Sequence, residues 1–316
     1  MSKDYVVGVD IGGQTAKIGI VNKKGDILAR KVISTKFEDA NEFITLLSKT
    51  IREMATDAGI VMDDINGVGV GAPDGNYYTG DIVEATNLMW AKGKTVHFAN
   101  ELSKMLGGQP VTITNDANAA AIGEMKYGAA KKMKNFIEIT LGTGVGSGIV
   151  VDGKLVYGHD GFAGELGHTC AIKNGRACGC GQKGCLEAYC SATGVARTAK
   201  EMLEKSDRPS LLREYKDITS KDVFDAAEKG DEMAKEIFEY TGKVMGEKFA
   251  DFIPFSAPET IILFGGLTHA KDYFMEYLVD AMNENVVFLW KGKVKVLVSA
   301  LNESDAAILG ASALAW

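Results

Sequence analysis

One short segment of the chain, residues 164–187, carries a set of side chains that bind metal ions in proteins. One histidine and three cysteines stand close together there, at His168, Cys178, Cys180 and Cys185. One imidazole and three thiolates form the ligand set of a closed structural zinc site. Cysteines that only fill a core need not be grouped between glycines that permit tight turns, so the spacing favours a metal. We therefore predict a bound zinc ion.

Two carboxylates, Glu165 and Glu187, flank this cluster. A zinc site with four such ligands does not need carboxylates beside it. The segment is therefore expected to present polar groups to a ligand as well as to hold a metal. The two remaining cysteines, Cys170 and Cys190, are expected to be ordinary buried thiols, although either could be a substitute ligand.

Two glycine-rich turns, one in each half of the chain, are candidates for binding phosphate. Glycine lets backbone N–H groups approach phosphate oxygens with no Cβ in the way, and a nearby hydroxyl can add a hydrogen bond. An aspartate before the first turn could hold Mg²⁺ directly or through water. Each turn alone could be a plain hairpin, but the pair could clamp the phosphates of one nucleotide across a cleft. The residues are Asp10, Gly12, Gly13, Gln14 and Thr15 in the first half, and Gly142, Thr143 and Gly144 in the second.

Two better-known phosphate motifs are excluded. The glycine run that begins at Gly142 lacks the third glycine of a dinucleotide-binding fingerprint, and a predicted strand follows it where that fingerprint needs a helix. Gly93-Lys94-Thr95 could end a P-loop, but Leu88 stands where that loop needs its first glycine.

A carboxylate suited to acid–base chemistry lies between a predicted strand that begins at Val111 and the helix that follows it. Asn115, Asp116 and Asn118 are all polar. One of them could be an ordinary N-cap, but three exceed what a cap requires. Asp116 at the carboxyl end of a strand fits a general base that accepts a hydroxyl proton, and phosphoryl transfer needs little else beyond positioning and charge neutralisation.

The elements that must position these groups alternate between strands and helices, which predicts α/β layers with a mixed sheet in each half. The strand–turn–strand opening of the chain recurs in the second half, which favours duplication of one unit. Strands are expected at 5–9, 15–21, 27–33, 65–71, 136–141, 147–151, 154–157, 260–264 and 294–299, and helices at 40–58, over most of 190–253 and at 304–314.

The composition fits a globular protein with room for two lobes, since the chain has 316 residues, 46% of them hydrophobic and 24% charged. A net charge of −7 disfavours nonspecific binding to nucleic acid or to a membrane surface. We find no signal segment, no run long enough to cross a bilayer and no cysteine pattern typical of disulfides. A cytoplasmic location is expected.

Together these motifs resemble those of the ROK family (repressor, open reading frame, kinase) of the hexokinase/actin-like ATPase superfamily. The resemblance spans nearly the whole chain, and the metal cluster is its most specific part. It implies a two-lobed actin-like ATPase (ribonuclease H-like) fold with a duplicated mixed sheet, flanking helices and a central cleft. The segments that carry it are 10–13, 71–73, 87–90, 115–118, 142–144, 165–168, 178–187 and 265–266.

The resemblance also implies how the site is divided. A small lobe would comprise residues 1–118 with the C-terminal helix at about 303–316, and a large lobe residues 119–302. Asp116 would be the catalytic base, and His168 would serve both sites, because one ring nitrogen can bind zinc while the other donates to the sugar. The sugar would bind to Asn87, Asn115, Asp116, Glu165, His168 and Glu187, and the nucleotide to Asp10, Gly12, Gly13, Gln14, Thr15, Gly142, Thr143, Gly144, Gly265 and Gly266.

The implied activity is ATP- and Mg²⁺-dependent phosphorylation of a hexose, with glucose the expected substrate and the 6-hydroxyl the acceptor. Fructose, mannose, N-acetylmannosamine and N-acetylglucosamine stay open, because hydroxyl discrimination depends on site geometry. Polyphosphate as the phosphoryl donor stays open too. A homodimer is expected from the resemblance alone.

Two residues depart from the family pattern: Gln14 stands where threonine is usual, and Asp74 where glycine is common. The rival class is a sugar-sensing repressor of the same fold. It would need an N-terminal helix-turn-helix, for which a strand beginning at Tyr5 leaves no room. A pure zinc or redox module would leave Asp116 and the two glycine turns unexplained.

Overall fold

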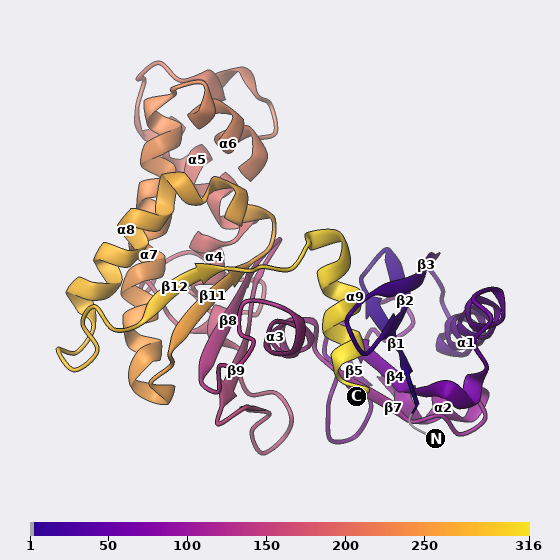
Figure 1. Cartoon of the computed structure of the whole chain (residues 1–316). Coiled ribbons are helices and arrows are strands. Elements are labelled where there is room, and N and C mark those ends of the chain that lie inside the picture. Colours follow the sequence, from indigo (N-terminus) through magenta and orange to yellow (C-terminus); the bar gives the residue numbers. More distant parts are fainter. Residues whose placement is uncertain (1–2) are drawn as a thin grey trace. The chain divides into compact units, whose positions relative to one another are not determined.

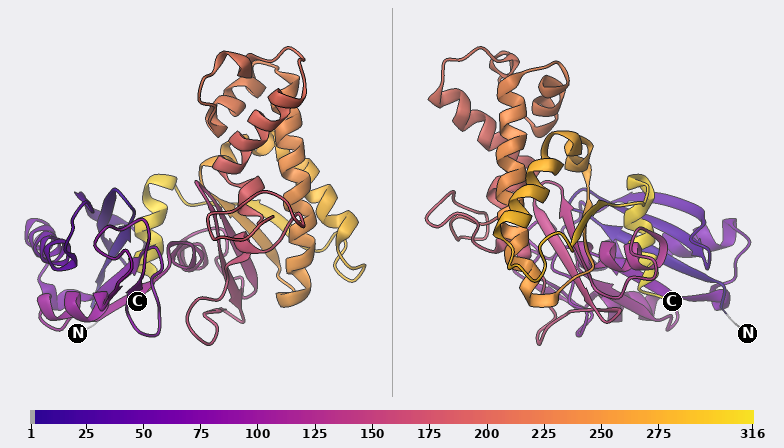
Figure 2. Two further views of the ribbon diagram at one scale, coloured as in Figure 1. Left: turned by 180° about the vertical axis from the view of Figure 1, so that it is seen from behind. Right: turned by 60° about the vertical axis from the view of Figure 1, so that its left-hand side comes forward.

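The computed structural model describes residues 3–316, with residues 303 and 304 described by their backbone alone. Contacts divide the chain into two compact units. The first unit consists of Met1–Met133, Lys154–Ala163 and Ser299–Trp316, and the second of Lys134–Gly153 and Gly164–Val298. Figure 1 labels the helices and strands of both units, and Figure 2 shows them from two further sides.

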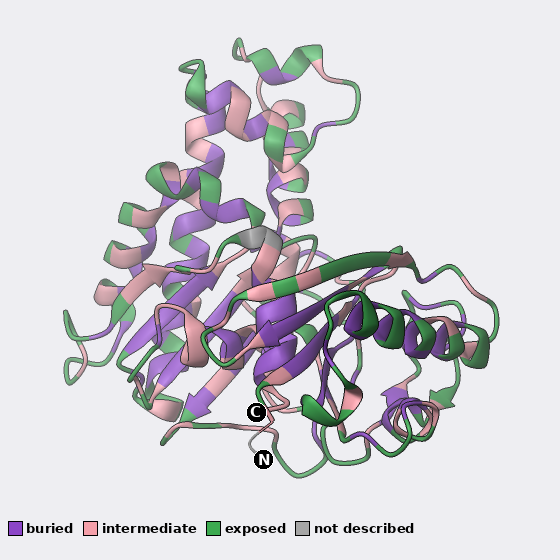
Figure 3. Ribbon diagram, turned by 45° about the vertical axis from the view of Figure 1, so that its right-hand side comes forward, coloured by how far each residue is buried: buried purple, intermediate pink, exposed green. Residues whose placement is uncertain are grey.

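The first sheet has five strands in the order β3 (Ile27–Ser34), β2 (Thr15–Asn22), β1 (Tyr5–Ile11), β4 (Ile65–Gly71), β7 (Val111–Thr114). β1 pairs antiparallel with β2 and parallel with β4, and β4 pairs parallel with β7. The edge strand β3 carries only half-buried and exposed residues, whereas β1 and β4 are largely buried (Figure 3). The carboxyl ends of β1, β4 and β7 therefore meet at one edge of the sheet, which is where α/β sheets bind ligands.

Helices cover both faces of this sheet. α1 (Ala40–Asp57) and α2 (Phe98–Met105) pack on one face, and α3 (Asp116–Tyr127) and α9 (Glu303–Ala313) lie on the other. Side chains alternate between the faces along each strand. In β1, Val7 and Val9 contact the core beneath α1 and α2, whereas Val6 packs with Ile308 of α9.

Three glycines form a row across the first sheet on the face that α9 covers. Gly8 is paired in register with Gly19 of β2 and with Gly69 of β4. A Cβ on Gly69 would overlap the carbonyl oxygen of Ala311, and one on Gly8 would overlap that of Ile308. α9 therefore packs directly on the sheet backbone.

The second sheet has the order β10 (Lys154–Leu155), β9 (Val145–Val151), β8 (Phe136–Leu141), β11 (Thr260–Phe264), β12 (Lys295–Val298). β8 pairs antiparallel with β9 and parallel with β11, and β11 pairs parallel with β12. This is the strand order and orientation of the first sheet, so the duplicated mixed sheet expected from the sequence is confirmed.

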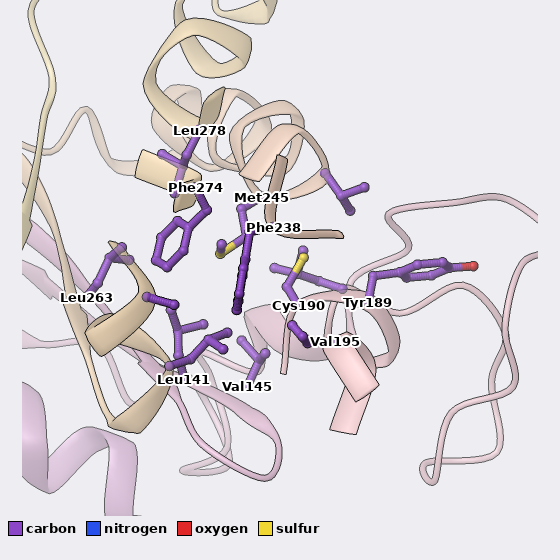
Figure 4. Packing of buried hydrophobic residues seen from close by; sticks show 14 of the residues in the cluster. Leu141, Val145, Tyr189, Cys190, Val195, Phe238, Met245, Leu263, Phe274 and Leu278 are labelled. Carbon is purple, nitrogen blue, oxygen red and sulfur yellow. The ribbon is translucent and has the colours of Figure 1, made fainter. Parts of the chain in front are cut away.

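The helices of the second unit are α4 (Glu187–Cys190), α5 (Ala192–Lys205), α6 (Ser220–Glu228), α7 (Glu232–Ser256) and α8 (Lys271–Asn285). α7 and α8 lie side by side (Figure 2). Their backbones approach closely because Gly246 faces the carbonyl of Leu278, where a Cβ would overlap it. Figure 4 shows Leu141 and Val145 pointing toward Phe238 in the core between this sheet and its helices.

Several elements do not follow from the sequence periodicity. These are α2, the short ribbon of β5 (Ile82–Val83) and β6 (Thr95–Val96), and the 3₁₀ turns Met62–Asp64, Leu166–His168, Leu211–Glu214 and Gly266–Ala270. By contacts α3 belongs to the first unit, because Gly123 of α3 packs against Gly310 of α9. The lobe boundary expected at residue 118 would place most of α3 in the other lobe, and which grouping moves as one body stays a prediction.

Candidate active site

The first candidate phosphate turn joins β1 to β2. The N–H of Gly12 donates to the carbonyl of Thr15 (2.9 Å), which closes the turn. A Cβ on Gly13 would lie 3.1 Å from the carbonyl oxygen of Asn87, so this glycine lets the segment that carries Asn87 pack against the turn. Gln14 and Thr15 are exposed. The structure thus brings a predicted nucleotide residue and a predicted sugar residue together.

Asp10 lies near the end of β1, beside this turn. Burial raises the pKa of its carboxyl group, Lys17 lowers it in part and Asp116 raises it again, so that the pKa is about 6. A bound cation would stabilise the charged form of such a carboxylate. Asp10 therefore suits the role of a ligand to Mg²⁺ or to water bound to that ion.

Asp116 is the first residue of α3, and one residue separates it from the end of β7. The preceding Asn115 is the N-cap, and its side chain accepts the N–H of Asn118 (2.8 Å). The Asp116 side chain is exposed to solvent, yet the protein atoms around it desolvate the carboxyl group and raise its pKa. Backbone N–H groups offset part of this increase, including that of Ala117, which donates to Oδ1 at 2.8 Å. A carboxylate that is accessible and more basic than usual can accept a proton from a substrate hydroxyl.

A second carboxylate, Asp74, lies near Asp116. The N–H of Ala72 donates to the carbonyl of Thr114 (3.0 Å), and a Cβ on Gly75 would lie 2.6 Å from the same oxygen, so this loop packs against the end of β7. Burial raises the pKa of Asp74, and Asp116 raises it further. Asp74 has a φ of 53°, in the left-handed region that favours glycine. The departure from the family pattern therefore places an extra carboxylate beside the predicted base.

The four predicted zinc ligands come together in the second unit. The ligand atoms of His168, Cys178, Cys180 and Cys185 all lie within 4.8 Å of one another. The Sγ atoms of Cys180 and Cys185 are 3.6 Å apart, and Nδ1 of His168 is 3.6 Å from Sγ of Cys178. Two sulfurs about 2.3 Å from a tetrahedral zinc ion would lie roughly 3.8 Å apart. Donor types and spacing therefore fit zinc, and Nδ1 is the ring nitrogen of His168 that lies near Sγ of Cys178.

A buried arginine anchors the loop that carries these ligands. The guanidinium of Arg176 donates to both carboxylate oxygens of Glu201 (Nη2 to Oε2, 2.8 Å), to the carbonyl of Ala188 (2.9 Å) and to the hydroxyl of Thr198 (2.9 Å). It also lies 4.4 Å from the centre of the Tyr189 ring. The metal loop is thereby fixed to α4 and α5 by contacts that do not involve the metal.

The two other cysteines differ from each other. Cys190 is fully buried, as expected, and its thiol lies 3.7 Å from the carbonyl of Thr241. The expectation that Cys170 is buried is wrong, because its residue is exposed. It pairs with Cys185 through an isolated β-bridge, so the backbone at Cys170 shapes the metal loop while its side chain remains at the surface. Neither thiol belongs to the ligand group among the described residues.

The second candidate phosphate turn joins β8 to β9. The N–H of Gly142 donates to the carbonyl of Gly144 (3.0 Å). The N–H of Ala192 donates to the carbonyl of Gly142 (2.9 Å), and the hydroxyl of Thr193 to that of Thr143 (2.9 Å). Donor groups at the start of α5 therefore hold the turn by binding the carbonyl groups of Gly142 and Thr143.

Of the two flanking carboxylates, Glu187 contacts this turn. Its Oε2 accepts the N–H of Val145 (3.0 Å), and its Oε1 lies 3.6 Å from Sγ of Cys178. A Cβ on Gly144 would overlap the same carboxylate. Glu165 directly precedes the 3₁₀ turn that carries His168, and its carbonyl accepts the His168 N–H (3.1 Å). The structure therefore places Glu187 between the metal cluster and the phosphate turn, which the sequence did not predict.

The predicted nucleotide residues Gly265 and Gly266 follow β11. Gly265 has a φ of 108°, and a Cβ there would lie 2.7 Å from the carbonyl oxygen of Leu141. Because β8 and β11 are parallel, this glycine packs against the residue that precedes Gly142. The two glycine segments of the second unit therefore lie together.

Sequence reasoning missed an aromatic group in the first unit. The rings of Tyr77 and Tyr157 stack with centroids 3.9 Å apart, and Tyr78 meets both edge-on. The Tyr78 hydroxyl donates to the carbonyl of Gly158 (2.8 Å). The Tyr-Tyr pair after Asp74 was the only signal in the sequence, and it does not reveal the distant partner.

A family model described as "ROK family" matches residues 6–316. The chain belongs to the ROK family. Among curated relatives it is 36% identical over 282 residues to a glucokinase of Halalkalibacterium halodurans, an alignment that covers 87% of this chain and 84% of the relative. The resemblance inferred from the motifs is thereby confirmed.

Solved structures agree with this assignment. The chain is similar to a ROK hexokinase from Thermus thermophilus, with a TM-score of 0.82, 27% identity and coverage of 98% and 97% of the two chains. It is also similar to a ROK family glucokinase from Streptomyces griseus in complex with glucose and AMPPNP, with a TM-score of 0.78, 28% identity and 98% coverage of both chains. The fold class expected from the sequence is confirmed.

Relatives with other activities are present as well. An N-acetylmannosamine kinase of Salmonella heidelberg is 29% identical over 98% of this chain and 97% of its own length. A xylose repressor of Caldicellulosiruptor bescii is 28% identical over 98% of this chain and 77% of its own length.

Within residues 3–316, no helix is long and apolar enough to span a membrane.

Proposed function

We propose that this protein is an ATP-dependent glucokinase that transfers the γ-phosphoryl group of ATP to the 6-hydroxyl of glucose. The observation that carries the proposal is the accessible carboxylate of Asp116, whose pKa is raised, at the carboxyl end of β7 and near Asp10 and its glycine turn. The similarity to glucokinases, and to a glucokinase structure with glucose and AMPPNP, supports ATP and glucose as the substrates.

Each residue has a proposed part in the reaction. Asp116 accepts the proton of the sugar hydroxyl as that oxygen attacks the γ-phosphorus and the β–γ bridging bond breaks. Mg²⁺, when bound, neutralises phosphate charge, and Asp10 is its proposed protein contact. The nucleotide phosphates bind to the turns that contain Gly12, Gly13, Gln14 and Thr15, and Gly142, Thr143 and Gly144, with Gly265 and Gly266 beside the second turn.

In this proposal, hydrogen bonds hold the sugar. Asn87, Asn115, Glu165, His168 and Glu187 bind its hydroxyl groups. Because Nδ1 of His168 lies near Sγ of Cys178, Nε2–H is the group that donates to the sugar. Zinc is structural here, because four protein ligands fill its coordination shell.

Location and assembly are part of the same proposal. We place the protein in the cytoplasm and expect it to form a homodimer. The lobes that close on the substrates are residues 1–118 with about 303–316, and residues 119–302.

A coupled ADP-release assay tests the function. The panel includes glucose, fructose, mannose, N-acetylglucosamine and N-acetylmannosamine, with ATP and polyphosphate compared as donors. Glucose with ATP is expected to give the highest kcat/KM. A preference for N-acetylmannosamine would favour the activity of that relative. Absence of turnover with every sugar, together with tight sugar binding, would favour a regulator.

A further inference from the structure

We propose that Glu187 is a positioning residue that links the metal cluster to the phosphate turn, so that metal occupancy sets nucleotide affinity as well as sugar affinity. This inference rests on the proposed kinase function. It concerns how Glu187 acts, because a carboxylate that only binds sugar hydroxyls has no need to hold the backbone of the Gly142–Gly144 turn.

The link consists of a few short steps. Cys185 is fully buried and is one of the four candidate metal ligands. Only Leu186, which is also fully buried, separates Cys185 from Glu187 in the chain. The Glu187 carboxylate then accepts the Val145 N–H at 3.0 Å, at the point where the phosphate turn enters β9. A displacement of Cys185 is therefore transmitted to the turn through two residues.

The helix that carries Glu187 packs against the hydrophobic core of the second unit. Tyr189 and Cys190 of α4 belong to the hydrophobic core, together with Leu141 and Val145, which flank the turn (Figure 4). The carboxylate also lies so close to Gly144 that a Cβ there would overlap it. The position of Gly144 in the turn is thus tied to the position of this carboxylate.

Removal of the Glu187 carboxylate changes nucleotide affinity in opposite directions, depending on whether Glu187 acts by charge or by positioning. A carboxylate beside the turn that binds the nucleotide phosphates repels their negative charge. If charge alone matters, removal of the Glu187 carboxylate should therefore strengthen nucleotide binding. If Glu187 positions the turn, its removal should weaken binding, because the Val145 N–H loses a charged acceptor and the turn loses its anchor.

The experiment measures the dissociation constant of ADP by calorimetry without sugar, for zinc-loaded and zinc-stripped protein whose folding is checked by circular dichroism. Wild-type protein should bind ADP about 10-fold more weakly after zinc removal, which corresponds to about 1.4 kcal/mol. Glu187→Ala should show the same weakening with zinc present and little further change when zinc is removed. Glu187→Gln keeps an acceptor oxygen for Val145 and should restore most of the affinity.

Glu204→Ala is the matched control, since it removes an exposed carboxylate of α5 in the same unit and should keep both the ADP affinity and its dependence on zinc. ADP affinity that does not depend on zinc would overturn the inference while leaving the kinase proposal standing. Tighter ADP binding by Glu187→Ala would overturn it as well. If zinc-loaded wild-type protein bound no nucleotide, the kinase proposal would fall and this inference with it.

Discussion

Burial raises the pKa of Asp74, and the nearby carboxylate of Asp116 raises it further. Asp74 also holds a φ of 53°, a left-handed conformation that costs a residue with a Cβ about 1 kcal/mol. Backbone strain of this kind often marks a functional site. Since like charges act on each other, we expect Asp74 to increase the basicity of Asp116.

The first prediction concerns this pair. Asp74→Asn removes the charge but keeps the size and the tolerance of left-handed backbone. The pKa of Asp116 should fall, so the acidic limb of kcat/KM against pH should move to lower pH. Asp63→Asn is the control, because it changes an exposed acid of the same unit and should leave the acidic limb of the pH profile in place. An unmoved limb in Asp74→Asn would show that the two carboxylates are not coupled.

The second prediction tests the base itself. Asp116→Asn retains an oxygen that can accept the Ala117 N–H, so α3 should begin as before. Loss of the base should lower kcat by about 10²–10⁴-fold while the dissociation constant of glucose changes little. Steady-state kinetics and calorimetry with glucose measure the two quantities. Turnover within a few fold of wild type would remove Asp116 from the role of base.

The third prediction is a dependence of stability on pH. The pKa of Asp10 is about 6 in the folded protein, above the ordinary value of 3.8. The folded state therefore favours the protonated form of Asp10. The contribution of Asp10 to the free energy of unfolding falls as pH rises from about 4 through 6. The full cost above pH 6 is on the order of 3 kcal/mol.

Asp10→Asn removes this cost. The variant should unfold at a higher urea concentration than wild type at pH 7–8, and the difference should vanish near pH 4. The same change should weaken nucleotide binding with Mg²⁺, which is the usual exchange of stability for function at an active site. A stability difference that is equal at pH 4 and pH 8 would contradict the assigned pKa.

The sequence predicts those parts of this structure whose signal is local. The metal ligands lie within one loop, and their residue types alone indicate zinc. Helix α1 has a clear apolar face that contains Phe43, Leu47 and Ile51, and the strands are recognisable as short apolar runs. Asp116 is recognisable because it lies at the junction between a strand and a helix.

The remaining features depend on pairings between distant residues. Gly8, Gly19 and Gly69 form one row only through the register of three strands, so their common role in seating α9 is not visible in the sequence. Tyr157 finds Tyr77 across a separation of 80 positions. The prediction that Cys170 is buried is wrong for a similar reason. Its backbone pairs with that of Cys185, while its side chain stays at the surface.

The fourth prediction concerns the arginine behind the metal loop. The Arg176 side chain is 6% exposed and binds Glu201, whereas the Arg197 side chain binds the same carboxylate while 44% exposed. Arg176→Lys keeps the charge but cannot reproduce the forked geometry, so most of the hydrogen bonds that Arg176 donates to Glu201 and to two backbone carbonyls are lost. The loss of stability should be about 2 kcal/mol, because a buried charged group loses several of its hydrogen bonds.

Arg197→Lys is the matched control and should cost less than about 1 kcal/mol, because exposed ion pairs contribute little. Urea unfolding measures both changes, and zinc content after dialysis against a weak chelator reports on the loop. Arg176→Lys should lose zinc more readily than Arg197→Lys, because the loop that presents Cys178 and Cys180 is then less fixed before the metal binds. Equal zinc retention by the two variants would mean that the cluster forms independently of the arginine network.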